Sequence, residues 1–111
     1  MKFFETKSSN NLNQITRYFY GMLRHYNINI KGKVQGVNYR FNAQAQAHKF
    51  NLTGFVRNKP DGSVYCEVEG LEENINKFIE WCYVGSLRAK VSEVNSEESE
   101  LVGYHTFEVK K

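Results

Sequence analysis

A short glycine-containing segment that ends in an arginine is the first place in this sequence where residue types and spacing suggest chemistry. The segment GKVQGVNYR runs from Gly32 to Arg40. Gly32 and Gly36 permit a tight backbone and the close approach of a ligand, so that successive N–H groups can face one concavity. Arg40 falls at the start of an expected helix, where its planar guanidinium can offer two donors to an anion. The segment therefore predicts an anion-binding loop.

This loop matches neither of two familiar phosphate-binding patterns. It lacks the GK[ST] ending of the Walker loop, and its two glycines are four positions apart rather than in a GxGxxG arrangement. Taken alone, the same residues also fit a plain turn between a strand and a helix with an arginine at the surface. A second segment is needed to choose between these interpretations.

The elements on either side of the loop are predicted by residue periodicity. Apolar and polar residues alternate over 25–33, which predicts a half-buried strand. Alanines and phenylalanines among polar residues over 39–50, with no Gly or Pro, predict a helix that ends near Asn51. Asn tolerates the left-handed backbone conformation found at helix C-termini. The loop thus joins a strand to a helix.

The remaining elements complete one α+β domain. Periodicity and turn residues predict a hairpin of strands over 54–58 and 63–70, a helix from Leu71 that ends at Gly85, and strands over 89–94 and 104–109. The polar stretch over 95–103 is expected to be a loop. A strand–helix–strand unit that occurs twice predicts a ferredoxin-like split βαβ fold with both helices on one face of the sheet.

The domain is expected to span residues 22–111, preceded by an N-terminal extension of residues 1–21. A chain of 111 residues is one domain's worth. The spacing of Leu12, Ile15 and Phe19 predicts a short amphipathic helix, whereas the polar SSNN segment before it favours a mobile appendage. Both alternatives remain open for this extension.

Positive charge is concentrated in the first half of the chain. Between Thr6 and Pro60 there are nine Lys or Arg and no Asp or Glu, whereas Asp61 to Lys111 hold eleven acids and five bases. A basic half attracts an anion such as a phosphorylated small molecule, a nucleic acid or an acidic protein. Folding can also bring the acidic half alongside and neutralise this field, so charge alone does not choose a partner.

Other features of the composition argue against membrane, metal and cofactor roles. No apolar run approaches the roughly 18 residues of a membrane span, and the first residues lack a signal-peptide pattern, so a cytoplasmic location is expected. Cys66 and Cys82 lack CxxC spacing and are expected to be free thiols, although a disulfide remains open. His25, His48 and His105 have no ligand spacing, so no metal is expected.

A second motif changes the interpretation of the first. The segment GFVRNKPDGSVYCEVEG covers 54–70, and Asn58 within it follows Arg40 by eighteen residues. Together the two segments resemble the signature segments of the acylphosphatases, enzymes that hydrolyse the mixed anhydride of a carboxylic acid and phosphate. The resemblance extends from Met22 to the end of the sequence and includes Ala47, Leu52, Phe78, Trp81 and Gly85.

The resemblance implies a fold and a site. It implies a five-stranded, mostly antiparallel ferredoxin-like sheet, with Arg40 and Asn58 as the catalytic pair. Because an amide has no accessible pKa near neutrality, Asn58 is expected to orient the attacking water, while Arg40 holds the phosphoryl oxygens. The implied phosphate cradle consists of the backbone amides of Gln35, Gly36, Val37, Asn38 and Tyr39.

The same resemblance implies the partners. The expected substrate is a small-molecule acyl phosphate, and inorganic phosphate or sulfate can occupy the same site. No nucleic acid, membrane, metal or cofactor is expected, and the protein is expected to be a monomer.

Two other functions remain as alternatives. RNA recognition motifs share this topology, and TGFVRN distantly resembles one of their conserved segments, but the first strand lacks a central stacking aromatic residue. A non-catalytic domain that binds carbamoyl phosphate, as in hydrogenase maturation proteins, is expected to continue into zinc-binding segments that this sequence lacks. Structural roles are expected for the remaining residues of note, with Phe41, Phe50, Phe78 and Trp81 in the core and Glu97, Glu98 and Glu100 in a solvated loop.

Overall fold

The computed structural model describes residues 21–111, which form five strands and two helices. In chain order these are β1 (Leu23–Lys33), α2 (Tyr39–Lys49), β2 (Thr53–Asn58), β3 (Val64–Leu71), α3 (Glu72–Val84), β4 (Lys90–Ser99) and β5 (Phe107–Val109). The expected order of strands and helices is confirmed. The helix expected around Leu12, Ile15 and Phe19 lies outside the described residues.

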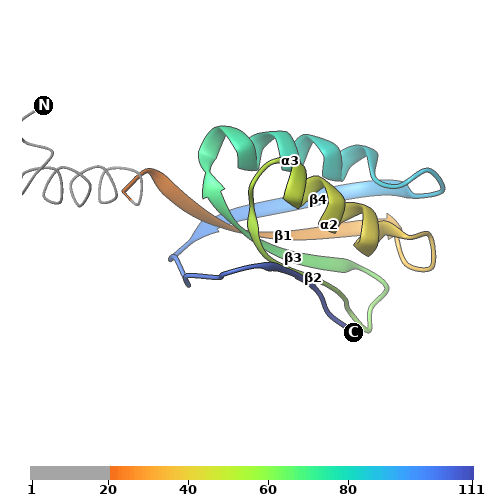
Figure 1. Cartoon of the computed structure of the whole chain (residues 1–111). Helices are drawn as coiled ribbons and strands as arrows, with labels where there is room; N and C mark the ends of the chain where they lie inside the picture. Colours follow the sequence, from red (N-terminus) through yellow and green to blue (C-terminus); the bar gives the residue numbers. More distant parts are fainter. Residues whose placement is uncertain (1–20) are drawn as a thin grey trace, which may run out of the picture.

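The strands form a single sheet in the order β4-β1-β3-β2-β5. β1 pairs antiparallel with both β3 and β4, and β2 pairs antiparallel with β3. Only the pairing of β2 with β5 is parallel. Figure 1 shows α2 and α3 side by side on one face of this sheet. The expected ferredoxin-like, mostly antiparallel α+β fold is confirmed.

The core fills the space between the two helices and the sheet. The buried positions of α2 are Tyr39, Ala43 and Ala47, which are four residues apart and share one stripe. The two alanines are small and let this helix lie close to the strands. Each fully buried aliphatic side chain contributes about 1.5–3 kcal/mol. The other fully buried side chains include Ile28, Ile30, Val64, Cys66, Val68, Ile75, Phe78 and Cys82.

Each helix ends at the residue expected from the sequence. At the end of α2 the N–H of Phe50 donates to the carbonyl of Gln46 at 3.0 Å, and Asn51 adopts φ 56°. At the end of α3 the N–H of Gly85 donates to the carbonyl of Trp81 at 2.8 Å, and Gly85 adopts φ 74°. Both chain reversals thus use residues that tolerate the left-handed region.

The last two strands differ in length from the prediction. The stretch 95–99, predicted as part of a loop, belongs to β4, where Glu97 pairs with Asn27 of β1. Polar composition indicated a loop, but an edge strand that faces solvent needs no apolar face to keep its backbone hydrogen bonds. Glu97 and Glu98 are exposed as expected, although within a strand. β5 is only Phe107–Val109, three residues instead of six.

The core prediction is wrong for Phe41. Phe78 is fully buried, and Phe50 and Trp81 are partly buried against the core, but 63% of Phe41 is exposed. At about 100° per residue, Phe41 lies roughly 200° from Tyr39 around the helix, away from the buried stripe. An apolar side chain near the start of α2 therefore faces solvent.

Candidate active site

The two sequence motifs meet at one pocket of about 200 Å³. It lies among the β1–α2 loop, the first turn of α2 and the last residue of β2. Arg40 from the first motif and Asn58 from the second both line it. The remaining lining residues are Val34, Gly36, Asn38, Tyr39 and Phe41.

Hydrogen bonds fix the β1–α2 loop and the first residue of α2 to three neighbouring segments. Gln35 Nε2 donates to the carbonyls of Lys59 at 2.8 Å and Ser63 at 2.9 Å, which ties the loop to the β2–β3 turn. The hydroxyl of Tyr39 donates to the carbonyl of Cys82 on α3 at 2.8 Å. Because burial raises the pKa of Tyr39 far above its ordinary value, this phenol remains a neutral donor.

A third contact holds the middle of the loop. The side chain of Val37 is buried, and its carbonyl accepts a hydrogen bond from Ser86 Oγ at 2.6 Å. Ser86 lies between α3 and β4 and is itself buried. The loop backbone is thus held in place by hydrogen bonds at Gln35, Val37 and Tyr39.

The loop backbone leaves its N–H groups free. Within residues 21–111, none of the N–H groups of 35–39 donates a hydrogen bond to a protein acceptor. Gly36 at φ 73° and Asn38 at φ 62° supply the positive φ angles of this turn. Free N–H groups next to a helix N-terminus attract an anion. Gly36, Asn38 and Tyr39 line the pocket, whereas Gln35 and Val37 do not.

Gly32 has a different role from the expected one. A Cβ at Gly32, where φ is 128°, would lie 2.1 Å from the carbonyl oxygen of Lys90 on β4. The register of β1 and β4 also shifts between Lys31 and Gly32. Gly32 therefore permits two strands to approach rather than a ligand. A Cβ at Gly36 would have nothing within 4 Å, so only Gly36 leaves open space beside the pocket.

Arg40 is held at the pocket by the C-terminal segment. It is half-buried near the start of α2, and its Nη1 donates to the carbonyl of Lys110 at 2.8 Å. The N–H of Lys110 in turn donates to the carbonyl of Val56 on β2 at 2.8 Å. Figure 1 shows the C-terminus beside the turn that joins β2 to β3. Nothing in the two motifs indicated this contact.

Asn58 presents an unpaired oxygen. It is the last residue of β2, and its Oδ1 is buried without a hydrogen-bond partner among the described residues. An unpaired buried polar atom costs about 1–3 kcal/mol. Because Asn58 lines the pocket, this oxygen can accept a hydrogen bond from a molecule bound there.

The electrostatics of the pocket favour an anion and offer no general base. Arg40 is the one charged residue in the lining, which contains no His, Asp, Glu or Cys. In the part of the chain that the structure describes, no three such residues gather in a group that could hold a metal ion. No helix in residues 21–111 is long and apolar enough to cross a membrane.

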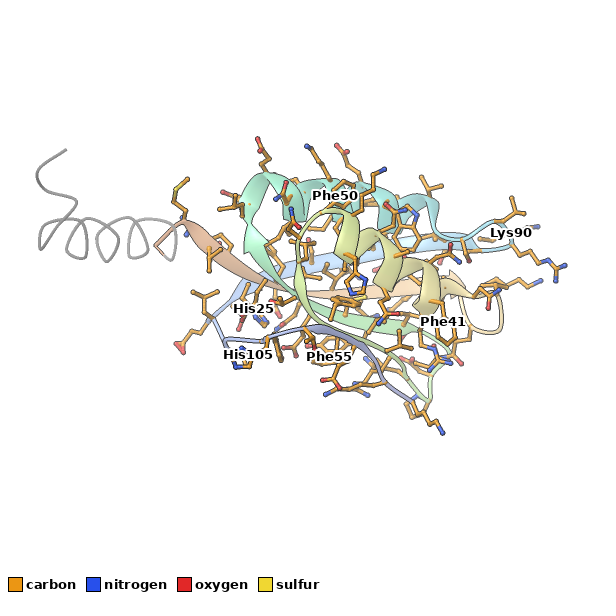
Figure 2. The ribbon with its side chains drawn as sticks, viewed as in Figure 1. His25, Phe41, Phe50, Phe55, Lys90 and His105 are labelled. Atoms are coloured by element: carbon orange, nitrogen blue, oxygen red, sulfur yellow. The ribbon has the colours of Figure 1, made fainter. Side chains whose placement is uncertain are left out.

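A buried histidine–carboxylate cluster lies at the other end of the sheet, as the label of His25 in Figure 2 shows. His25 Nδ1 lies 2.7 Å from Glu69 Oε2, and His25 Nε2 lies 3.2 Å from Glu67 Oε1. Glu69 also accepts the N–H groups of Val102, Gly103 and Tyr104. This cluster anchors the loop between β4 and β5. No motif or spacing in the sequence indicated this cluster, because its three residues belong to separate strand positions.

Hydrogen bonds determine the ionisation of Glu69, whereas burial determines the state of the cysteine thiols. Burial raises the pKa of the Glu69 carboxyl, but the hydrogen bonds from Val102, His25 and its other donors outweigh that and hold the pKa below its ordinary value. Cys66 and Cys82 are free and buried, as expected. Burial raises the pKa of Cys82 to about 12.

Comparison with known proteins assigns this architecture to a family. The acylphosphatase family model matches residues 26–109, which include the whole pocket. The chain belongs to the acylphosphatase family. An acylphosphatase of Bacillus licheniformis is 44% identical over 85 residues, which cover 76% of this chain and 94% of that protein.

Solved structures agree with the family assignment. An acylphosphatase from Coxiella burnetii superposes with a TM-score of 0.80 at 33% identity and covers 82% of this chain and 96% of its own. A full-length HypF in a phosphate- and nucleotide-bound form matches with a TM-score of 0.72 and 32% identity. That match covers 80% of this chain but only 12% of HypF.

These comparisons bear on the alternatives. The expected function, an acylphosphatase with hydrolase activity on acyl phosphates, is confirmed. Neither the RNA-binding module nor the non-catalytic domain is favoured.

Proposed function

We propose that Arg40, Asn58 and the free amides of 35–39 hydrolyse the carboxyl–phosphate bond of small-molecule acyl phosphates without a metal ion. The observation that carries this proposal is that Arg40 and Asn58, eighteen residues apart in the sequence, line one pocket beside those amides. Val34 and Tyr39 complete its buried wall.

The phosphoryl group binds first. Its oxygens accept hydrogen bonds from the amides of Gln35, Gly36, Val37, Asn38 and Tyr39, and the positive end of the α2 dipole adds to the attraction. Arg40 contributes a planar, permanently charged group. Its bond to the carbonyl of Lys110 fixes the guanidinium before substrate arrives, so little orientational entropy is lost on binding. Inorganic phosphate and sulfate present the same oxygens and bind at the same place.

The chemical step is attack by water. Asn58 Oδ1 accepts a hydrogen bond from the attacking water and aims its oxygen at phosphorus. The new P–O bond forms as the bond between phosphorus and the acyl oxygen breaks, and that electron pair leaves on the carboxylate. The released proton passes to a phosphoryl oxygen, because the pocket lining has no His or carboxylate to accept it. A doubly charged acyl phosphate and water thus give a carboxylate and dihydrogen phosphate.

A weakly basic leaving group explains why so few residues suffice. A carboxylic acid has a pKa near 4, so its carboxylate departs without a proton from a general acid. Positioning and electrostatic stabilisation are the main contributions that phosphoryl transfer requires of a protein. A metal ion is not needed to assist the leaving group, and the pocket lining offers Arg40 in its place.

We also propose that the enzyme is a monomer that works in the cytoplasm. The β4 edge of the sheet carries exposed Lys90, Glu93, Glu97 and Glu98, and charged residues of this kind discourage edge-to-edge pairing. The free thiols Cys66 and Cys82 fit a reducing compartment. Sedimentation velocity measures the oligomeric state, and a stable dimer at micromolar concentration contradicts the monomer.

Residues 22–111 are proposed to be the catalytic domain, with 1–21 as an extension. β1 begins at Leu23, and the family model begins at residue 26. A truncated protein that starts at Met22 is expected to keep the kcat/KM and Tm of the full chain. A fall in either quantity assigns residues 1–21 to the functional domain.

Substitution of Asn58 tests the role that distinguishes this mechanism. Asn58→Ala is expected to lower kcat for benzoyl phosphate on the order of a hundredfold, because the water loses its orienting acceptor. The inhibition constant of inorganic phosphate should not change, since Arg40 and the amides remain. Asn95→Ala on β4, three strands away in the sheet, is the matched control. Lost phosphate binding with an undiminished residual rate contradicts the role of Asn58.

A further inference from the structure

The exposed ring of Phe41 has no structural role that explains it. Among the described residues, six large apolar side chains are exposed, and Phe41 is the one that lines the pocket with Arg40 and Asn58. The other apolar lining residues, Val34 and Tyr39, are buried in the core. Figure 2 labels Phe41 at the end of α2 that adjoins the β1–α2 loop. An apolar surface therefore lies next to the polar phosphate site.

We propose that Phe41 forms the binding surface for the acyl group of the substrate and favours aromatic and larger aliphatic acyl phosphates. This inference rests on the proposed function, which places the phosphoryl group against the amides and Arg40. The acyl group is joined to that phosphoryl group by one oxygen, so it has to lie against the residues at the pocket rim. Phe41 is bonded directly to Arg40 in the chain, and among the residues that line the pocket its ring is the exposed apolar surface.

The lack of a competing structural role strengthens the assignment. Phe41 lies on the side of α2 away from its buried stripe, so its ring does not contribute to the core. Phenylalanine also has a lower helix propensity than alanine. An aromatic ring is costly to hydrate, and contact with an apolar acyl group removes part of its surface from water.

A second surface beside the site gives the alternative position for the acyl group. A neighbouring pocket of about 350 Å³ shares Gly36 and Asn38 with the phosphate pocket and is also lined by Ser86, Leu87 and Arg88. Leu87 is fully exposed there. This pocket does not include Arg40, Asn58 or Phe41. Because its lining contains the exposed Arg88, it suits a charged acyl group better than an apolar one.

The proposed contact is remote from the reacting bond, which determines its kinetic effect. A contact that is equally strong in the bound substrate and the transition state changes KM and leaves kcat unaltered. An aromatic contact of this kind is expected to change KM about three- to tenfold. The effect should be absent for acetyl phosphate, whose methyl group covers little of the ring.

The test compares Phe41→Ala with Leu87→Ala on two substrates, using the full chain. Phe41→Ala is expected to raise KM for benzoyl phosphate about three- to tenfold. Its kcat, its kinetics with acetyl phosphate and its inhibition by inorganic phosphate should remain unaltered. Leu87→Ala is expected to match the unsubstituted protein on both substrates.

Each other outcome overturns the inference in a recognisable way. Equal losses on both substrates in Phe41→Ala assign the residue to folding or to the phosphate site. A selective loss in Leu87→Ala places the acyl group in the neighbouring pocket. An unchanged KM together with an altered sedimentation coefficient in Phe41→Ala makes the ring a contact between copies of the chain. No hydrolysis of either substrate by the unsubstituted protein overturns the proposed function itself.

Discussion

Replacement of Arg40 by lysine removes the geometry of the guanidinium and keeps its charge. In the structure Nη1 of Arg40 already donates to the carbonyl of Lys110 at 2.8 Å, which leaves the other guanidinium donors for the phosphoryl oxygens. A lysine ammonium is a single point donor, so it has to divide its hydrogen bonds between that carbonyl and the substrate. We therefore expect Arg40→Lys to lose at least one charge-assisted hydrogen bond in the transition state.

The size of the loss follows from that bond. A hydrogen bond to a charged group contributes about 1.5–3 kcal/mol. At about 1.4 kcal/mol per factor of ten, kcat/KM for benzoyl phosphate should fall about 10- to 150-fold. The free energy of unfolding should change by less than about 0.5 kcal/mol, because Arg40 is only half-buried and its charge is retained.

The assay is the initial rate of benzoyl phosphate hydrolysis, with urea unfolding measured on the same preparations. Arg57→Lys is the matched control, since Arg57 precedes Asn58 but its Cζ lies 5.3 Å from the centre of the Tyr65 ring. The control is expected to keep its kcat/KM. Unchanged turnover in Arg40→Lys, or an equal loss in Arg57→Lys, refutes the assignment of Arg40 to the phosphoryl group.

Three further predictions concern Gly32 in β1, Gly36 in the β1–α2 loop and Glu69 in the distant cluster. Gly32→Ala should lower the free energy of unfolding by more than about 2 kcal/mol, because its Cβ meets the backbone of β4. Gly36→Ala should lower the free energy of unfolding by only about 1–2 kcal/mol, from backbone strain, and should mainly reduce kcat/KM. Urea unfolding of both variants measures this difference, and equal destabilisation of the two variants contradicts the separate roles of the two glycines. Glu69→Ala should lower the free energy of unfolding at pH 7 by about 1–3 kcal/mol, since it leaves the buried His25 ring and the N–H groups of the β4–β5 loop without their hydrogen-bond acceptor. Folding lowers the pKa of Glu69. The contribution of ionised Glu69 to the free energy of unfolding is therefore fully present above the pKa of the unfolded state, about 4.3, and is lost as pH falls through the lower pKa of the folded state. The difference in the free energy of urea unfolding between Glu69→Ala and the unsubstituted protein should therefore shrink toward pH 3. A difference that stays constant with pH refutes the role of ionised Glu69.

Local sequence patterns predicted the strands and helices because the information for these elements lies within each segment. Alternation over 25–33 predicted the first strand, and the turn residues before Ser63 predicted the start of β3. Asn51 and Gly85 predicted the positions where the two helices end. The pairing of Arg40 with Asn58 came from motif spacing and resemblance, since neither segment alone excluded an ordinary turn. The shared pocket supports that pairing from geometry.

Features that depend on contacts between distant segments could not be predicted. Hydrogen bonds join Arg40 to the carbonyl of Lys110 and Gln35 to the β2–β3 turn. These segments are far apart in the sequence, and no local pattern indicates that they meet. Gly32 fitted a ligand loop equally well until the position of β4 was known. Phe41 was predicted in the core because it is apolar, whereas the direction of its side chain depends on which stripe of α2 the sheet covers.

Hydrolysis of benzoyl phosphate by the unsubstituted full chain, with and without excess chelator, shows whether the pocket works without a metal ion. We expect the same turnover in both conditions, because the proposed mechanism uses only Arg40, Asn58 and the loop amides. Turnover that disappears with chelator and returns with added metal ion contradicts the metal-free mechanism. No turnover in either condition contradicts the catalytic assignment of this pocket.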